Sequence, residues 1–148
     1  MTEAKPTGRE ITSSEDIAAL VKGARRVAVL GIKTAAQSGQ PAYYVPEYLA
    51  GAGVEVIPVP VYYPEATEIL GQRVYRAVKD IPGTVDIVDV FRRPADIDAH
   101  LDDIIAARPR AVWFQSGIRN DSAAKRLRDA GIDVVQDRCL MVDHRRYG

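Results

Sequence analysis

Residues 27–41 read Val-Ala-Val-Leu-Gly-Ile-Lys-Thr-Ala-Ala-Gln-Ser-Gly-Gln-Pro. The stretch opens with a short apolar run rich in β-branched residues, which is typical of a strand covered on both faces. Gly31 ends this run, and Pro41 suits the first turn of a helix, where its missing N–H leaves no bond unmade. A buried strand, a loop and a helix in this order form the repeating unit of a parallel α/β sheet.

Four more apolar runs continue the pattern along the chain. They begin at residues 54, 86, 111 and 132, and successive starts are 21 to 32 residues apart. This spacing leaves room for a crossover helix and is too long for a tight hairpin. The gap from 62 to 82 is irregular, with a weak helical stretch at 73–79, whereas the other gaps carry helical patterns at 43–50, 95–107 and 122–130. We therefore predict an α/β fold with a doubly wound, five-stranded parallel sheet and helices on both faces, in three layers.

The N-terminal end has a different character. Residues 1–10 are polar and lack the apolar segment of a signal peptide, so we expect a flexible tail there and a single domain over 11–148. Residues 12–15, Thr-Ser-Ser-Glu, have the form of a capping box that starts a helix. Ile17, Leu20 and Val21 follow at the spacing of one helical face.

Composition excludes several classes of protein. Twenty basic and twenty acidic residues give a net charge of +0, which argues against a nucleic-acid binder, since such proteins carry a basic excess. No apolar run reaches the roughly 18 residues of a membrane span. Cys139 is the only cysteine, which excludes an internal disulfide and any multi-cysteine metal site. We expect a globular protein with a cytoplasmic location.

A ligand of such a sheet binds beyond the carboxyl ends of the strands. The loop after Gly31 runs into a helix N-terminus and contains Lys33, an arrangement that suits phosphate, although an ordinary βα loop has the same form. Arg92 and Arg93 follow the third strand and can meet phosphate or pair with Asp96 or Asp98. NAD is not expected, because the compact G-x-G-x-x-G turn is absent.

Three segments carry a resemblance to a known family: 86–94 (Asp-Ile-Val-Asp-Val-Phe-Arg-Arg-Pro), 112–120 (Val-Trp-Phe-Gln-Ser-Gly-Ile-Arg-Asn) and 137–142 (Asp-Arg-Cys-Leu-Met-Val). In this order the chain resembles the small CoA-binding domain family, whose Rossmann-like fold also forms the CoA-binding part of the succinyl-CoA ligase alpha subunit. The resemblance implies that coenzyme A is the ligand. It places the CoA phosphates at the Gly31 loop and the helix after Pro41, adenosine beside Pro58 to Pro60, and the pantetheine channel along Phe91 and Gln115. The full set of expected ligand-binding residues is Gly31, Ile32, Lys33, Thr34, Gln40, Pro41, Pro58, Val59, Pro60, Phe91, Arg92, Arg93, Gln115, Ser116, Gly117, Ile118 and Cys139.

Two positions depart from the family pattern. Relatives have Arg-Pro-Ser before the helix, where this chain has Gln40, Pro41 and Ala42, and they have Ala-Ser after the first glycine, where this chain has Ile32 and Lys33. The change at Gln40 removes one phosphate cation, for which Lys33 can compensate.

Candidates for catalysis are few. His100 is expected on the surface of a helix, and His144 lies in a basic tail. Cys139 has three interpretations: a partner of His144, a small buried hydrophobe, or a thiol that forms a mixed disulfide with CoA, helped by the positive charge of Arg138. Asp86 and Asp89 are expected to pair with arginines rather than to bind a metal, and no metal site is expected.

Three hypotheses on function follow. The first is a protein that binds CoA or an acyl-CoA at the carboxyl edge of the sheet without catalysis of its own. The second is a component of an acyl-CoA-dependent transferase or ligase that uses Cys139 or a partner subunit. The third is a nucleotide-responsive regulatory interaction module.

Overall fold

The computed structural model describes residues 7–148, and they contain one sheet of five parallel strands. Its order is β2-β1-β5-β6-β7, formed by Glu55–Val59, Arg26–Leu30, Ile87–Val90, Ala111–Phe114 and Asp133–Val135. All four pairings are parallel, as the apolar runs predict. The prediction of a doubly wound, five-stranded parallel sheet is confirmed.

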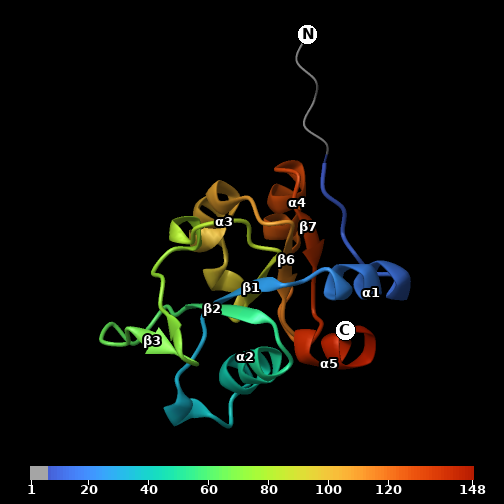
Figure 1. Cartoon of the computed structure of the whole chain (residues 1–148). Helices are drawn as coiled ribbons and strands as arrows, with labels where there is room; N and C mark the ends of the chain where they lie inside the picture. The colour runs from blue at the N-terminus through green and yellow to red at the C-terminus, as the bar shows by residue number, and fades with distance from the viewer. Residues whose placement is uncertain (1–6) are drawn as a thin grey trace.

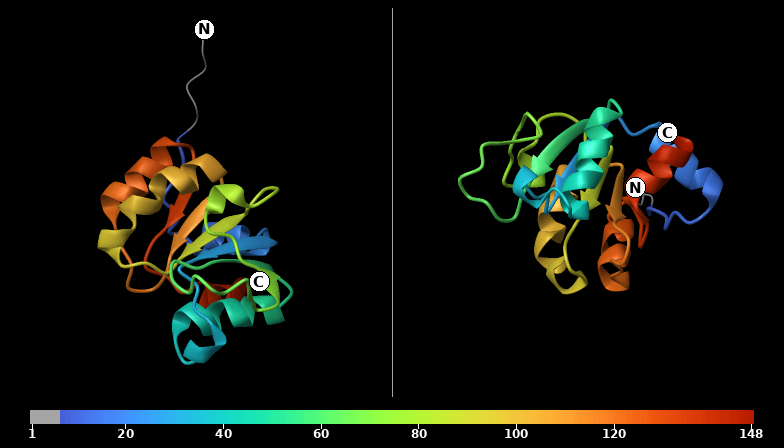
Figure 2. Two further views of the ribbon diagram at one scale, coloured as in Figure 1. Left: turned by 90° about the vertical axis from the view of Figure 1, so that its left-hand side faces the viewer. Right: turned by 90° about the horizontal axis from the view of Figure 1, so that it is seen from below.

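Helices cover both faces of this sheet and make the domain three layers deep (Figures 1 and 2). One layer holds α1 (Ser14–Lys22), α2 (Pro41–Gly51) and α5 (Leu140–Tyr147), and the other holds α3 (Leu101–Ala107) and α4 (Asp121–Asp129). Alternate residues of each strand enter two separate cores. In β1, Val27 and Val29 pack under α1, α2 and α5, whereas Ala28 and Leu30 pack under α3 and α4. This division explains why the strands read as continuous apolar runs.

The helices α1 and α4 each begin after a residue whose polar side chain caps the helix N-terminus. The hydroxyl of Ser13 accepts the N–H of Asp16 at 3.2 Å, so the residue that caps α1 is the second residue of the predicted capping box. The side chain of Asn120 accepts the N–H of Ala123 at 3.0 Å and caps α4.

Three segments differ from the sequence-based expectations. The region 95–107 holds two short 3₁₀ turns, η3 (Pro94–Asp96) and η4 (Asp98–His100), before α3 begins. The stretch 73–79 is not a helix, because it contains the end of a small antiparallel pair, β3 (Glu68–Ile69) and β4 (Gln72–Arg73), and the beginning of the turn η2 (Val78–Asp80). The expected basic tail is the helix α5, with Asp143 in its first turn and basic residues in its last turn, which complements the helix dipole.

Asp86, which directly precedes β5, and Asp89, which lies within β5, have different surroundings. The carboxylate of Asp86 accepts the N–H groups of Arg25 and Arg26 at 2.9 Å each, and it lies 3.9 Å from the guanidinium of Arg110. Asp89 is fully buried between Val29 of β1 and Trp113 of β6, and neither of its oxygens has a hydrogen-bond partner among the described residues. The expected pairing with arginine is therefore wrong for Asp89. Burial raises the pKa of its carboxyl well above the ordinary value.

The described part of the N-terminal segment is attached to the sheet. The N–H of Gly8 donates to the carbonyl of Arg128 at 2.7 Å, and Glu10 forms a parallel bridge with Val134 of β7. The carboxylate of Glu10 also accepts bonds from Arg128 and Gln136 at 3.2 and 2.9 Å. The rest of the expected tail, residues 1–6, lies outside the described residues. Across residues 7–148, the helices are all too short or too polar to cross a membrane.

The order of the strands determines where the connections at the carboxyl edge of the sheet diverge. From β1 the chain passes to β2 on one side, and it later returns to the other side as β5, so the connections that leave β1 and β5 diverge. At this point Gly31 has φ +86°, and a Cβ there would lie 2.4 Å from the carbonyl oxygen of Phe91. Glycine is therefore required for the carboxyl ends of these two strands to approach each other.

Candidate ligand-binding site

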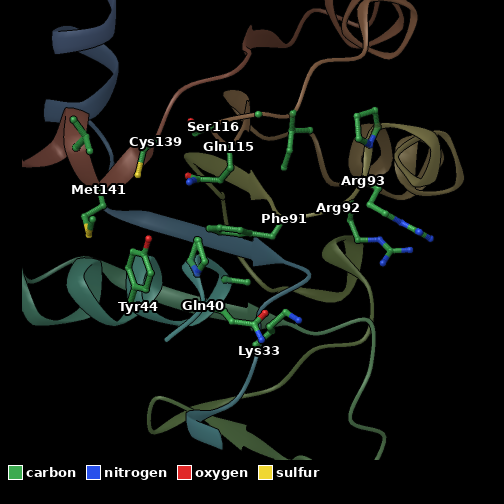
Figure 3. Close-up of a pocket in the computed structure, with 16 residues that line it drawn as sticks. Lys33, Gln40, Tyr44, Phe91, Arg92, Arg93, Gln115, Ser116, Cys139 and Met141 are labelled. Carbon is green, nitrogen blue, oxygen red and sulfur yellow. The ribbon is translucent and has the colours of Figure 1, made fainter. Parts of the chain in front are cut away.

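A cleft of about 730 Å³ opens at this divergence (Figure 3). It is built from the loops that follow β1, β5 and β6 and from the first turns of α2 and α5. It is lined by Lys33, Gln40, Pro41, Ala42, Tyr44, Phe91, Arg92, Arg93, Pro94, Gln115, Ser116, Gly117, Ile118, Cys139, Met141 and Val142. A volume of this size accommodates a ligand the size of a cofactor or a drug.

The start of α2 forms one side of the cleft. Lys33 and Gln40 lie next to each other in Figure 3, one from the loop after β1 and the other immediately before the helix. Gln40 is the N-cap residue, and its side chain makes no capping bond. The N–H of Ala42 has no backbone acceptor among the described residues, so the positive end of the helix faces the cleft beside a lysine. This side is suited to an anion.

Arg92 and Arg93 lie on another part of the rim, after β5. The carboxylate of Asp96 accepts from Arg93 Nε at 2.9 Å and lies 3.8 Å from an amino group of Arg92. The pairing with Asp96 that the sequence allowed is therefore present, and both arginines still line the cleft. The guanidinium of Arg92 also lies over the ring of Tyr62, 5.8 Å from its centroid.

His100 contacts Arg92 and is partly exposed, at the end of η4 and not in the middle of a helix as expected. The Nε of Arg92 donates to Nε2 of His100 at 3.2 Å. An arginine has no acceptor, so this contact requires a neutral imidazole with its proton on Nδ1. Partial burial, followed by the positive charge of Arg92, holds the pKa of His100 below its ordinary value. The neutral form that the bond needs is thus the favoured form.

The loop after β6 provides amide groups on the far wall. Gln115 is buried, and its Oε1 accepts the N–H of Leu140 at 3.1 Å, which ties this loop to the start of α5. The N–H of Gly117 donates to the carboxylate of Asp137 at 2.6 Å. These two bonds hold the backbone of Ser116 and Gly117 open to the cleft.

The start of α5 supplies a wall that contains two sulfur atoms. Cys139 and Met141 line the cleft here with Val142, and Tyr44 of α2 faces them (Figure 3). The guanidinium of Arg138 makes two bonds of 2.8 Å to Asp143, which raise the pKa of Arg138, so its charge is engaged by that carboxylate. Nδ1 of His144 lies 3.1 Å from the hydroxyl of Tyr48, and His144 does not line the cleft. Neither residue that the sequence offered as a helper is directed at Cys139.

Most of the residues expected from the sequence come together in this cleft. Those that line it are Lys33, Gln40, Pro41, Phe91, Arg92, Arg93, Gln115, Ser116, Gly117, Ile118 and Cys139. Gly31 lies behind the cleft, where the carboxyl ends of β1 and β5 approach each other, and Ile32 is buried in the core. The hydroxyl of Thr34 donates to the side chain of Gln37 at 2.7 Å, and Pro58, Val59 and Pro60 are buried in or just after β2.

Five lining residues were not expected: Ala42, Tyr44, Pro94, Met141 and Val142. Ala42 and Tyr44 follow Pro41 by one and three positions, so the predicted helix start at Pro41 could have placed both residues at the cleft. Met141 and Val142 lie in a segment that carries the resemblance, but their position depends on α5, which was not predicted. No group of three metal-binding side chains occurs within residues 7–148.

Comparison with known proteins gives this arrangement a family. Residues 25–145 match the model of the CoA binding domain. The chain belongs to this family. YneT of Bacillus subtilis (strain 168) is 30% identical over 132 residues, which cover 89% of this chain and 94% of that protein.

Two solved structures resemble this CoA-binding domain along nearly their whole lengths. The cell-free ID.343 protein from Thermus thermophilus is 40% identical, with a TM-score of 0.84 over 93% of this chain and 100% of that one. A hypothetical protein from Pyrococcus horikoshii OT3 is 30% identical, with a TM-score of 0.82 over 99% of both chains. The resemblance inferred from the three sequence segments is therefore confirmed.

Proposed function

We propose that this protein binds coenzyme A or an acyl-CoA in the cleft between β1 and β5, and that it does so without catalysis by its own residues. The observation that carries the proposal is the polarity of the cleft. Lysine, two arginines and the N-terminus of α2 follow β1 and β5, whereas the rest of the lining is largely neutral and includes Phe91, Gln115 and Met141. CoA has the same polarity, with anionic phosphates at one end and a largely neutral stem that ends in a thiol.

In this arrangement the phosphates lie beside Lys33 and the first turn of α2. The proximity of Lys33 to Gln40 supports the idea that the lysine supplies the positive charge that relatives have at the residue before the proline (Figure 3). A lysine is a point charge on a flexible stem, so it can reach a phosphate from a different position in the loop.

The stem then runs along Phe91 and the loop after β6 toward Cys139. Its two amide groups require donors and acceptors inside a mostly apolar channel. The side chains of Gln115 and Ser116 offer both. The proposal that no catalysis occurs is supported by the position of the histidines, since neither His100 nor His144 lines the cleft.

Thermal unfolding in the presence of CoA, NAD or pantetheine tests the proposal. A ligand that binds only the folded state adds about 2.7 kcal/mol when present at 100 times its Kd, so CoA is expected to raise Tm clearly above the value with NAD. Pantetheine, which lacks the nucleotide, is expected to act weakly. Equal shifts with CoA and NAD, or no shift with either, would overturn the proposal.

A matched pair of variants locates the site. Ser116 and Ser122 are both exposed, and only Ser116 lines the cleft. Ser116→Trp is expected to fill the cleft and abolish the CoA-dependent rise in Tm, whereas Ser122→Trp is expected to retain it. Retention of the rise in both variants would exclude this cleft as the binding site.

A further inference from the structure

Cys139 lines the cleft and also packs against the edge of the core beneath α5. It occupies the N-cap position of α5, yet its side chain makes no capping bond. It is only partly buried, and it is the one cysteine of the chain, so it has no disulfide partner. Its Sγ is thus exposed to whatever occupies the cleft, on the wall that it shares with Met141.

Gln115 supplies an independent sign that a polar ligand group belongs beside this thiol. Its side chain is only 3% exposed, and its Oε1 accepts the N–H of Leu140, the residue after Cys139. That bond also identifies the oxygen, because a backbone N–H needs an acceptor. The amide nitrogen of Gln115 has no partner within residues 7–148. In Figure 3 this amide end points toward Cys139 inside the cleft.

This amide nitrogen is open to the cleft, since the fully buried side-chain atoms without a partner within residues 7–148 are the two oxygens of Asp89, so a ligand that accepts its hydrogen bond takes the place of water. The acceptor that fits is a carbonyl oxygen, and the wall beyond it consists of a thiol, a thioether and the ring of Tyr44. A ligand that ends in an amide followed by a short apolar link and a sulfur atom matches this order. Its amide carbonyl then meets Gln115, and its terminal sulfur reaches the wall that carries Cys139.

We propose that Cys139 is a covalent modification site, which forms a mixed disulfide with the terminal sulfur of the ligand bound in this cleft. The inference rests on the proposed function, because it takes the ligand to be CoA, and it adds a regulation of the same site. Because the thiol of Cys139 reacts only with the disulfide form of the ligand, the occupancy of the cleft depends on the redox state of the ligand.

The reaction is a thiol–disulfide exchange with the symmetrical disulfide of CoA. The deprotonated Sγ of Cys139 attacks one sulfur of that disulfide, and a bond forms between Sγ and this sulfur. The S–S bond of the CoA disulfide breaks, and the second CoA leaves as a thiolate that takes a proton from solvent. One disulfide is consumed and one is formed, so no further oxidant is needed. Attack by a CoA thiol reverses the reaction.

Noncovalent binding and covalent capture therefore respond to different forms of one ligand. The free thiol binds reversibly, whereas the disulfide leaves one CoA attached until a thiol releases it. The attached fraction follows the ratio of CoA disulfide to CoA thiol, which makes the protein a store or a sensor of that ratio.

Intact-protein mass spectrometry tests the modification directly. Reduced full-length protein is incubated with CoA disulfide, and the expected product gains one CoA and no more, since the chain has a single cysteine. Dithiothreitol is expected to restore the original mass, and Cys139→Ser is expected to gain nothing. Because binding concentrates the reacting groups, the rate is expected to exceed that with glutathione disulfide by at least about tenfold.

Two variants and the binding of CoA thiol by the natural protein separate the inference from the proposed function. Cys139→Ser is expected to unfold at the same urea concentration as the natural protein, which shows that the variant is folded. Gln115→Glu keeps the oxygen that accepts from Leu140 but removes the amide donor, and it is expected to slow the adduct with CoA disulfide more than that with glutathione disulfide. Equal rates with the two disulfides, or no adduct in a protein that binds CoA thiol, would overturn the inference alone. Failure to bind CoA thiol would overturn the proposed function.

Discussion

The backbone N–H of Lys33 donates to the carbonyl oxygen of Ala42 at 3.1 Å, and this bond joins the loop after β1 to the first turn of α2. In an uninterrupted helix the carbonyl of Ala42 would accept from the residue four positions later. That residue is Pro46, which lies inside α2 and has no N–H. The proline therefore leaves a carbonyl free within the helix, and the loop uses it.

This bond fixes the backbone from which the side chain of Lys33 extends into the cleft. A proline in a helix interior is normally costly, and here the free carbonyl finds a partner in a loop that carries a candidate phosphate ligand. The helix and the lysine are positioned together.

Removal of the lysine charge is expected to weaken CoA binding. Lys33 is partly exposed, so Lys33→Ala should reduce the binding free energy by about 1 kcal/mol, a roughly fivefold loss of affinity measured by titration calorimetry. Gln40→Arg places a cation on the neighbouring position and is expected to restore the affinity of the Lys33→Ala protein. Affinity for pantetheine should stay unchanged both in Lys33→Ala and in the double variant with Gln40→Arg. Equal losses for CoA and pantetheine would show that the lysine acts on the fold and not on phosphate.

Alanine substitutions at two glycines of the same loop distinguish the cost of backbone strain from the cost of losing a glycine. Gly31 has φ +86°, and a Cβ there would lie 2.4 Å from the carbonyl oxygen of Phe91, whereas a Cβ at Gly39 would meet no atom within 4 Å. Gly31→Ala is expected to lower the free energy of unfolding by about 2–4 kcal/mol, and Gly39→Ala by less than about 0.5 kcal/mol. Denaturant unfolding measures both. Similar losses for the two variants would contradict the close approach of the carboxyl ends of β1 and β5 at Gly31.

The fold was predictable because its strands are short, apolar and separated by helical lengths of chain. Periodicity also placed α2 and α4 to within two residues of the observed ends. α5 was missed because three of its apolar residues, Leu140 to Val142, are consecutive and show no helical period, and its start is set by tertiary contacts such as the bond between Gln115 and Leu140. A local pattern carries no trace of such a bond.

The cleft was predictable to the extent that it follows the strand ends. Lys33, Arg92 and Gln115 each come just after an apolar run, so the rule for parallel sheets brings them to one edge. The role of His100 was not predictable, because it depends on two 3₁₀ turns replacing the first part of an expected helix. The solitary burial of Asp89 was also hidden, since charge alternation in a strand resembles a solvated face.

His100 gives the site a dependence on pH. Its pKa is lowered in the folded protein by burial and by Arg92, with Asp103 and Asp96 acting in the opposite direction. Between that lowered pKa and its ordinary value near 6.5, the unfolded chain binds more protons, so stability falls as the pH drops below about 6.5. Protonation also ends the bond from Arg92, so affinity for CoA is expected to fall between pH 7.5 and pH 5.5.

Glutamine can replace the acceptor without titrating, so His100→Gln should retain affinity at pH 7.5 and lose less of it at pH 5.5 than the natural protein. The ligand phosphate also titrates in this range, and the comparison between variants removes that contribution. His144→Gln, in the contact with Tyr48, is the control and should keep the natural loss of affinity. A natural pH profile in His100→Gln would mean that Arg92 does not depend on this histidine.

Asp89 is expected to lower the stability of the protein at neutral pH. Its carboxyl is buried without a partner, and desolvation raises its pKa well above the ordinary value of 3.8. Above pH 3.8 the unfolded chain releases this proton while the folded chain keeps it, so this residue's contribution to stability falls as the pH rises, until the raised pKa is passed. The slope of stability against pH reaches at most about 1.4 kcal/mol per pH unit.

Asp89→Asn is neutral at every pH and close in shape, so it should match the natural protein near pH 4 and exceed its stability at pH 7.5. Urea unfolding at both pH values measures the difference, and Asp129→Asn, on the exposed face of α4, should show no such gain. If Asp89→Asn matches the natural protein at pH 4 but is less stable than it at pH 7.5, the carboxyl of Asp89 is ionised and paired in the folded state.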